Sequence, residues 1–169
     1  MNLFFRLFVI FIESFFRKRL HPLAESVLNL RVLPNDLDLN LHMNNGSYLS
    51  LMDLGRLDLL IRTDLAKALV KHRWQPLVGG VNIRYKLSLM PFQKYRLHTK
   101  VIGWDEKWFY IEQRFERKNR TIPVGLVKAL FRGKNRNLTP EQVLKLIHVN
   151  IDPPDIPEAV LKWLSMEAN

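Results

Sequence analysis

The chain contains no cysteine. That absence excludes thiol nucleophiles, thiolate metal sites and disulfide scaffolds. The sequence also has neither a glycine-rich phosphate loop nor the Gly-x-Ser-x-Gly pattern of serine hydrolases, so we do not expect either kind of site. Four histidines, His21, His72, His98 and His148, have no metal-ligand spacing. We therefore expect neither a metal nor a cofactor.

Acidic side chains are few. There are 16 Asp and Glu against 26 Lys and Arg, which gives a formal charge of +10 over 169 residues. Such a charge favours an anionic partner, which could be nucleic acid, an acidic membrane surface or a substrate with several phosphates. Charge alone does not choose among them. The length suits one domain that buries about two-thirds of its unfolded surface, enough for a core without metals or disulfides.

A long uninterrupted apolar run is also absent. Residues 1–16 are almost all apolar, but Arg6 and Glu13 interrupt them, and the run is shorter than the ~20 residues of a spanning helix. A cleaved signal peptide fits poorly because the positive cluster, residues 17–19, follows the apolar stretch. Three alternatives stay open: an anchor in a membrane interface, which we favour, a terminal helix packed on the core, or a true span or signal.

The spacing of apolar residues predicts the next elements. Residues 25–33 alternate loosely, which indicates a strand, and residues 48–61 are apolar on most sides, which indicates a helix buried nearly all round. This helix continues or restarts as far as Val70. The period then becomes two, and we expect four strands joined by short turns, over residues 77–89, 95–101, 108–117 and 122–132. Such strands form an antiparallel meander that the helix would cover, which is an α+β arrangement.

The C-terminal part begins with a capping signal. Thr139 would cap a short helix that ends near Ile147, since proline follows it and Gln142 lies three residues on. A proline-rich link, residues 152–157, precedes a last helix that ends near Met166. We divide the chain into an apolar N-terminal helix with a basic flank (1–22), a main domain (23–137) and a helical tail (138–169).

The stretch from Asp36 to Asn45 is where we expect chemistry. It holds two carboxylates, an imidazole and three amides directly before the buried helix. Asn44 or Asn45 would cap that helix, and the free N–H groups of its first turn carry the positive end of the helix dipole. The loop therefore ends at a helix terminus that favours anions.

Two motifs in this region carry a family resemblance. They are Asp36-x-Asp38-x-Asn40-x-His42-x-Asn44-Asn45-x-x-Tyr48 and Asp53-x-Gly55-Arg56. With the order of elements, they make residues 28–132 resemble the hotdog-fold acyl-CoA thioesterases of the 4-hydroxybenzoyl-CoA thioesterase-like group. Asp38-x-Asn40-x-His42 is also similar to plant acyl-carrier-protein thioesterases. The resemblance implies the hotdog fold, an antiparallel sheet wrapped around a central buried helix, and hydrolysis of acyl-CoA or acyl-carrier-protein thioesters.

The resemblance also implies catalytic residues. Asp38 matches the general base or nucleophile of the family, and Asn40 and His42 match residues that orient and hydrogen-bond beside it. A backbone N–H near Asn44 or Asn45 would polarise the thioester oxygen, which becomes negative during the reaction. We therefore expect catalysis from Asp38, Asn40, His42 and Asn45.

Other residues take secondary assignments. Asp53 is a reserve base, because some hotdog enzymes place a catalytic carboxylate on this helix. The plant enzymes carry a further acidic residue on the next strand, whereas residues 83–89 contain none, so Asp38 is expected to act alone. The candidate substrate-binding residues, of which the last two would meet the phosphates of coenzyme A, are Asn44, Tyr48, Arg84 and Lys86.

Each assignment has a structural alternative. Asp36 and Asp38 follow a Pro-Asn turn, where carboxylates often bond local backbone. His42 could be a loop or core histidine satisfied by a neighbour. The two asparagines could be caps only, and Asp53 could form an ion pair with an arginine.

The expected partners follow from the same reasoning. They are an acyl-CoA substrate, a second copy of the chain in a homodimer or tetramer with the active site between protomers, and an anionic membrane surface contacted by residues 1–19. Nucleic acid is not an expected partner, since only the net charge of the chain supports it. We expect a cytoplasmic protein, with peripheral attachment to the inner face of a membrane as an option. The competing function is a non-catalytic acyl- or lipid-binding protein at a membrane surface.

Overall fold

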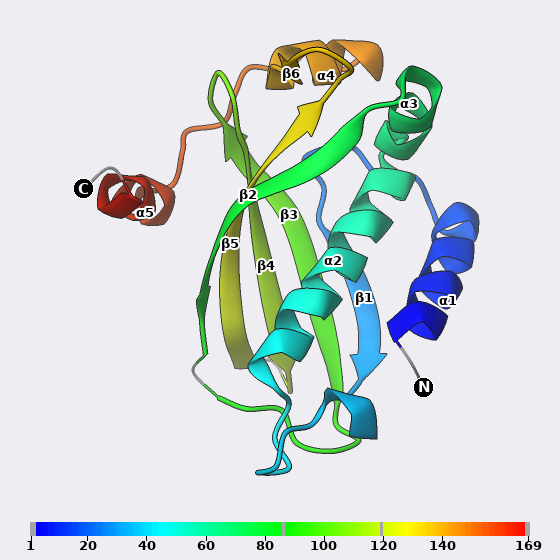
Figure 1. The fold of residues 1–169 in the computed structure, drawn as a ribbon, viewed down its shortest axis with the longest axis vertical. Helices are drawn as coiled ribbons and strands as arrows, with labels where there is room; N and C mark the ends of the chain where they lie inside the picture. Colours follow the sequence, from blue (N-terminus) through cyan, green and yellow to red (C-terminus); the bar gives the residue numbers. More distant parts are fainter. Residues whose placement is uncertain (1–2, 86, 119, 168–169) are drawn as a thin grey trace.

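The structure is a computed structural model that describes residues 3–85, 87–118 and 120–167 (Figure 1). Its elements, in chain order, are α1 (Leu3–Phe16), β1 (Ser26–Arg31), the 3-10 turn η1 (Pro34–Asp36), α2 (Asn45–Arg62), α3 (Leu65–His72), β2 (Gln75–Arg84), β3 (Lys94–Trp104), β4 (Phe109–Arg117), β5 (Arg120–Arg132), β6 (Asn137–Leu138), α4 (Pro140–Leu146) and α5 (Glu158–Glu167).

The strands form one antiparallel sheet in the order β1-β3-β4-β5-β2, with β6 paired to β5. The predicted meander is confirmed for β3, β4 and β5. It is wrong for β2, which pairs with β5 instead of β3. The edge of β3 that β2 was expected to occupy is taken by β1, whose Ser26 lies opposite Thr99. Between β2 and β3 the chain therefore crosses from the edge strand β2 past β5 and β4 to the far half of the sheet.

The strand predicted for residues 77–89 ends early. β2 stops at Arg84. Beyond it, the amide of Leu89 donates to the hydroxyl of Tyr48 at 3.0 Å, and the carbonyl of Leu89 accepts from the amide of Met43 at 2.8 Å. The prediction of strand is wrong for residues 85 and 87–89 because these bonds hold Leu89 against the loop before α2, away from the sheet; Lys86 lies outside the described residues.

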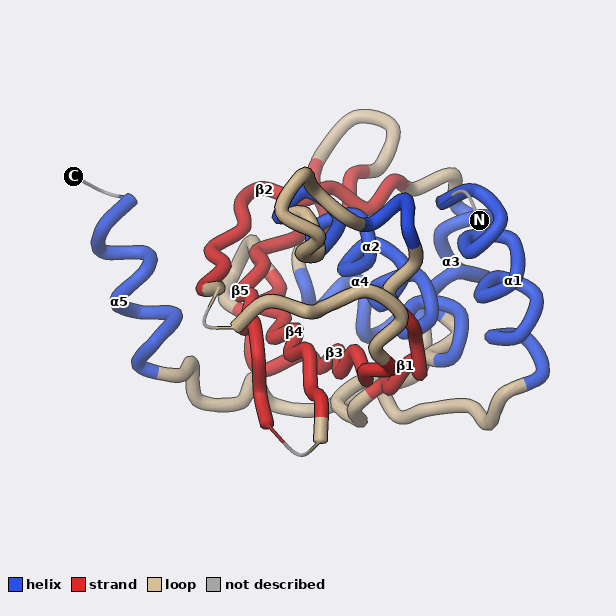
Figure 2. The backbone as a smooth tube through the Cα atoms, turned by 90° about the horizontal axis from the view of Figure 1, so that it is seen from below, coloured by secondary structure: helices blue, strands red, loops and turns tan. Residues whose placement is uncertain are grey.

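Helix α2 lies in the hollow of the curved sheet (Figure 1; Figure 2). The prediction of a helix buried nearly all round is confirmed on the side where Tyr48, Leu51 and Met52 are at most 1 % exposed, and it is wrong on another side, where Leu49 is 40 % exposed. Gly55 allows the closest approach to the sheet, because a Cβ there would lie 2.5 Å from Oγ1 of Thr99. The backbone of α2 therefore lies directly against β3 at this residue.

Helix α1 packs on α2 with its polar side inward. The buried residues of α1 are Arg6, Ile10 and Ser14. The hydroxyl of Ser14 donates to the buried carboxylate of Asp58 at 2.6 Å. The large apolar side chains face solvent: Leu3, Phe4, Phe5, Leu7, Phe8, Phe11, Ile12, Phe15 and Phe16. Among the described residues, no helix combines the length and the apolar character needed to cross a membrane.

The C-terminal elements agree with their prediction. Thr139 accepts from the amide of Gln142, whose side chain bonds back to the amide of Thr139, so the predicted capping box is confirmed. α4 joins an apolar cluster with the ends of β3, β4 and β5. α5 lies on the side of the sheet opposite α1 (Figure 2). The ammonium nitrogen of Lys128 lies 5.7 Å from the centroid of the Trp163 ring of α5.

Candidate active site

The loop before α2 is closed by its own backbone. The amide of Asp38 donates to the carbonyl of His42 at 2.8 Å, and Leu37 forms an antiparallel bridge with Met43. The carboxylate oxygen Oδ1 of Asp38 accepts from the amides of Asn40 at 2.8 Å and His42 at 3.2 Å. Within the described residues, the other oxygen, Oδ2, makes no hydrogen bond. The loop thus fixes one carboxylate oxygen and leaves the second available.

Asp36 has a different environment, although it is only two residues away. Its two carboxylate oxygens accept from the guanidinium of Arg6 at 2.8 and 2.7 Å, and both side chains are buried. A bidentate arginine–carboxylate pair is a strong and directional contact. The amide of Leu33 also donates to Asp36, at 2.8 Å. Asp36 therefore fastens the start of the loop to α1.

The start of α2 leaves one amide free. The side chain of Asn44 caps the helix by accepting from the amide of Gly46 at 2.7 Å. The amide of Asn44 itself donates to the carbonyl of Asp36 at 2.7 Å. Of the two amides that the sequence suggested as oxyanion donors, that of Asn44 is therefore occupied. The amide of Asn45, the first residue of α2, has no acceptor among the described residues.

The side chains of Asn40 and His42 are not used by the fold. His42 is half-buried, Asn40 is exposed, and neither side chain makes a hydrogen bond within the part of the chain that the structure describes. Their backbone amides bond Asp38, as given above. Both side chains can therefore bond a ligand without breaking an existing contact.

Tyr48 belongs to the core beside the loop. Its ring is 1 % exposed and packs edge-on against Phe115 and Tyr85, with centroids 4.9 and 5.5 Å away. Burial raises the pKa of the Tyr48 phenol, and its oxygen accepts from the amide of Leu89. Tyr85 in turn donates to the carbonyl of Asn45 at 3.2 Å. These contacts hold the crossing segment against the start of α2.

The two basic substrate-binding candidates lie apart from this loop. Arg84 lines a groove with Asn82 and Glu158, beside α5. A single copy of the chain therefore does not bring Arg84 to Asp38. Lys86 lies outside the described residues.

Asp53 sits two turns along α2. Its exposed carboxylate forms an ion pair with Arg56, whose guanidinium also donates to Oε1 of Gln113 at 2.6 Å. Burial lowers the pKa of Arg56, and the charge of Asp53 opposes that shift. Gln113 is fully buried and donates to the carbonyl of Met52 at 2.9 Å. The rise of an α-helix puts Asp53 ~12 Å along the axis from Asn45, so the two candidate bases occupy separate places.

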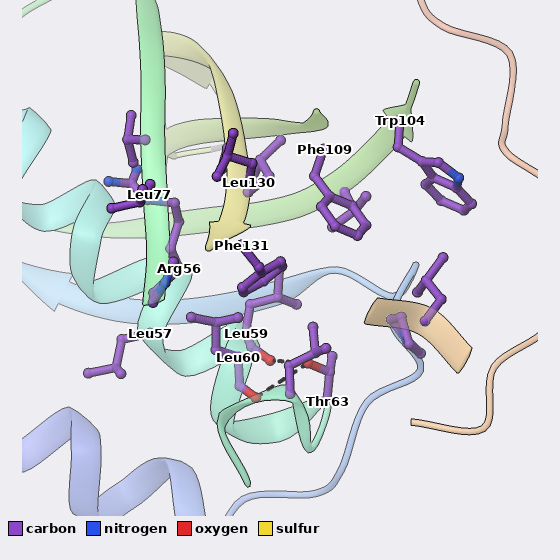
Figure 3. Close-up of a pocket in the computed structure, with 18 of the residues that line it drawn as sticks. Arg56, Leu57, Leu59, Leu60, Thr63, Leu77, Trp104, Phe109, Leu130 and Phe131 are labelled. Atoms are coloured by element: carbon purple, nitrogen blue, oxygen red, sulfur yellow. Dashed lines mark hydrogen bonds between the residues drawn. The ribbon is translucent and has the colours of Figure 1, made fainter. Parts of the chain in front are cut away.

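An apolar cavity of about 240 Å³ opens beside Asp53 and Arg56 (Figure 3). It lies between the second half of α2 and strands β2 to β5, with Leu144 of α4 also in its wall. Figure 3 shows Leu59 and Leu60 of α2 facing Leu130 and Phe131 of β5 across it.

Exposed apolar residues lie at the tip of the loop and along β2. Leu39 and Leu41 at the tip of the loop are exposed, and Leu39 has no cover at all, at 102 %. β2 ends the order of the sheet, and its Leu77 and Val78 are 37 and 47 % exposed. Leu77 and Val78, which line the cavity, are therefore partly open to solvent along β2.

No group of three or more metal-binding side chains is found among the residues that the structure describes.

Two contributors to the site were missed by sequence reasoning. Arg6 is 30 residues from Asp36, and its only sequence signal is a charge inside an otherwise apolar helix. Gln113 has no signal beyond a polar residue at an inward position of a strand. Both become visible only when the fold brings distant segments together.

Comparisons with known proteins agree with this arrangement. The family model of the thioesterase-like superfamily matches residues 32–164, which extends past the range of the resemblance into α5. Protein THEM6 of Danio rerio is 35 % identical over 145 residues, covering 84 % of this chain and 70 % of the relative. A probable thioesterase of Saccharomyces cerevisiae, YBR096W, is 27 % identical over 116 residues, covering 66 % and 50 %.

Solved structures are similar in fold. The YbaW probable thioesterase from Escherichia coli superposes with a TM-score of 0.66 at 19 % identity, covering 72 % of this chain and 95 % of the other. A 1,4-dihydroxy-2-naphthoyl-CoA thioesterase from Synechocystis gives 0.63 at 7 %, covering 73 % and 95 %. SAV2348 from Staphylococcus aureus, solved in complex with CoA, gives 0.62 at 13 %, covering 85 % and 96 %. The fold is the hotdog fold that the resemblance predicted.

Proposed function

This chain belongs to the thioesterase-like superfamily, and from that membership we propose that it hydrolyses acyl-CoA thioesters to a free acid and coenzyme A. The family supports thioester hydrolysis. A CoA-type substrate is supported by SAV2348, which was solved with CoA, and by the Synechocystis relative, which acts on a CoA thioester. Thioesters of an acyl-carrier protein are the second candidate substrate.

The proposed chemistry rests on one observation. Oδ2 of Asp38 and the amide of Asn45, neither of which makes a hydrogen bond among the described residues, belong to the same segment, residues 36–45. Oδ2 of Asp38 takes a proton from water while the water oxygen attacks the thioester carbonyl. The amide of Asn45 and the α2 dipole stabilise the negative oxygen of the tetrahedral intermediate. The C–S bond then breaks, and the leaving thiolate takes the proton. In the nucleophilic variant, Asp38 attacks directly and water hydrolyses the resulting anhydride.

The test is release of free thiol from short, medium, long and aromatic acyl-CoAs by the wild type, Asp38→Asn and Asp53→Asn. Asp152→Asn, an exposed carboxylate in the C-terminal link, is the matched control. We expect Asp38→Asn to lower kcat by about 10²–10⁴-fold, the usual contribution of a general base, and the control to keep the wild-type rate. Full activity of Asp38→Asn beside an inactive Asp53→Asn would move the base to the helix.

The alternative is a non-catalytic acyl- or lipid-binding protein. It is favoured by the absence of a carboxylate in residues 83–89 and by the exposed apolar face of α1. If it holds, the wild type turns over no thioester of either carrier, yet it binds S-dodecyl-CoA, a thioether that cannot be hydrolysed, in a calorimetric titration.

We propose that the chain acts as a homodimer joined at β2. Within the described part of the chain, the outer edge of this strand pairs with no other strand, and exposed apolar residues lie along it. Such an edge tends to pair with another strand, and a twofold axis would pair it with itself. Val81→Lys puts a charge on this edge and should give monomers in size-exclusion chromatography with light scattering. A dimer that survives the substitution would contradict an interface at β2.

We also propose that α1 docks the protein on an anionic membrane surface. An apolar helix face bordered by basic residues is typical of interfacial helices. Lys18 and Arg19 follow the helix, and Arg19 lies 3.5 Å from Asp64, at the rim of a groove that also holds Lys67 and Lys71. The basic side chains here outnumber the acidic ones, and this excess of positive charge beside the apolar face favours anionic lipids over neutral ones.

The membrane proposal is tested by co-sedimentation with vesicles of phosphatidylcholine alone or with phosphatidylserine. Phe8→Ser with Phe11→Ser should weaken binding at least about tenfold, since burial of a phenylalanine side chain is worth ~1.5–3 kcal/mol. Leu161→Ser removes an equally exposed apolar residue from α5 and should change nothing. Failure of the wild type to bind either vesicle would overturn the proposal.

A further inference from the structure

The cavity beside α2 has almost no polar group to offer a ligand. Thr63 lines it, but its hydroxyl already donates to the carbonyl of Leu59 at 2.7 Å. The indole nitrogen of Trp104 lies on the side of the ring away from the other labelled side chains (Figure 3). The other polar members, Asp53 and Arg56, are paired with each other and stand where the lining reaches furthest toward the start of α2.

From this wall we infer that the cavity holds the hydrocarbon chain of an aliphatic fatty acyl thioester, and that it excludes acyl groups with hydroxyls. The inference rests on the proposed function, because it names the substrate class of that site. Each methylene buried in such a wall strengthens binding, because it leaves water for an apolar surface. A hydroxyl buried there without a partner weakens binding, because it loses its hydrogen bonds to water. The Synechocystis protein acts on a dihydroxynaphthoyl thioester. The wall of this cavity would leave the hydroxyls of such a group without hydrogen-bond partners.

The size of the cavity sets the chain length. At about 240 Å³ the cavity is somewhat smaller than the ~300–1,000 Å³ of pockets that take drug-sized ligands, which suits a chain of medium length better than a long one. Trp104, Phe109 and Leu144, which also line the cavity, belong to a second apolar cluster. A medium-length chain therefore fills the cavity, whereas an acetyl group leaves it empty.

Ala129 is the residue whose enlargement tests the inference. It lies in β5 opposite Phe109 of β4 and Val78 of β2, and all three line the cavity. Leucine at this position takes space from the chain without adding charge or a polar atom. Ala66→Leu, the same substitution at a half-exposed position of α3 outside the cavity, is the matched control.

The experiment measures kcat/KM for hexanoyl-, decanoyl-, dodecanoyl- and 4-hydroxybenzoyl-CoA, together with calorimetric binding of S-dodecyl-CoA. We expect the wild type to prefer decanoyl- and dodecanoyl-CoA over 4-hydroxybenzoyl-CoA. Ala129→Leu should lower kcat/KM for dodecanoyl-CoA at least about tenfold, the lower end of what one methylene decides in an apolar pocket, with little loss for hexanoyl-CoA. Ala66→Leu should keep the wild-type profile.

The two readouts separate this inference from the proposed function. Turnover with a profile that Ala129→Leu leaves unchanged would overturn the inference and keep the function. Binding of S-dodecyl-CoA that weakens in Ala129→Leu, without turnover by any variant, would overturn the function and keep the cavity as the chain site. A preference for 4-hydroxybenzoyl-CoA would also overturn the inference.

Discussion

Asp105 is the residue through which the β3–β4 turn responds to pH. Its carboxylate accepts from the amides of Lys107 and Trp108, both at 2.7 Å, and from the hydroxyl of Tyr110. Burial alone would raise the pKa of Asp105, but these hydrogen bonds outweigh it and hold the pKa below its ordinary value of 3.8. The Asp105 carboxylate in turn raises the pKa of Tyr110, in addition to the effect of burial.

A carboxylate whose pKa is depressed by folding stabilises the fold above its unfolded pKa and loses that contribution as the pH falls through the folded pKa. Asp105→Asn should therefore lower the free energy of unfolding by about 1–3 kcal/mol at neutral pH, with a smaller difference from wild type below about pH 4. Urea denaturation at both pH values measures it. Asp155→Asn, an exposed aspartate, is the control, and a difference that stays constant with pH would contradict the role given to Asp105.

The sequence predicts which residues gather before α2 but not how two similar ones differ. Asp36 and Asp38 share a turn and a chemistry, and local spacing treats them alike. The structure separates them through Arg6, which reaches Asp36 from a helix outside the motif. A contact between residues 30 positions apart has no local signature, so the roles of the two carboxylates could not be assigned from spacing.

At the scale of elements, the Arg6–Asp36 pair fixes α1 to the loop. Removing one partner of a buried ion pair leaves the other charge buried alone, which costs about 3–5 kcal/mol. We expect Arg6→Met to lose stability by this amount in urea denaturation. Arg6→Met combined with Asp36→Leu should recover much of it, because no charge then stays buried. An equal loss in the single and the double variant would contradict this role of the pair.

Elements with their own periodicity were predicted well, and those fixed by distant partners were not. α2 and the capped start of α4 follow from apolar spacing and a Thr139 signal that lie within a few residues. The place of β2 depends on which sheet edge is vacant, and the end of β2 depends on bonds from Tyr48 and Met43 to Leu89. The alternating pattern of residues 77–89 predicts neither the position of β2 in the sheet nor the residue at which it ends.

At the scale of the whole molecule, the proposed dimer decides which Asp38 serves which cavity. Antiparallel pairing at β2 would set the two α2 helices antiparallel. The start of α2 in one copy would then point toward the cavity mouth of the other, whereas its own cavity begins ~12 Å further along the helix. We therefore expect each active site to combine Asp38 of one protomer with the cavity of its partner.

Mixed dimers test this arrangement. A dimer of one Asp38→Asn chain and one Ala129→Leu chain, isolated with two different affinity tags, should hydrolyse dodecanoyl-CoA at about half the wild-type rate, because one of its two sites is intact. Each parent homodimer should fall far below that. If the mixed dimer is no more active than its parents, Asp38 and the cavity act within one chain.

The inward polar side of α1 has a practical consequence for handling the protein. Deleting residues 1–19 would remove the exposed phenylalanines, but it would also remove Arg6, the ion-pair partner of Asp36. The buried carboxylate of Asp58 would lose its contacts with Ser14 and Arg17. The shortened polypeptide would keep Ser26 and Arg62 beside Asp58, but it would leave the Asp36 carboxylate without its guanidinium partner. A mild detergent that covers the phenylalanines, with the helix kept, is the sounder route to a well-behaved sample.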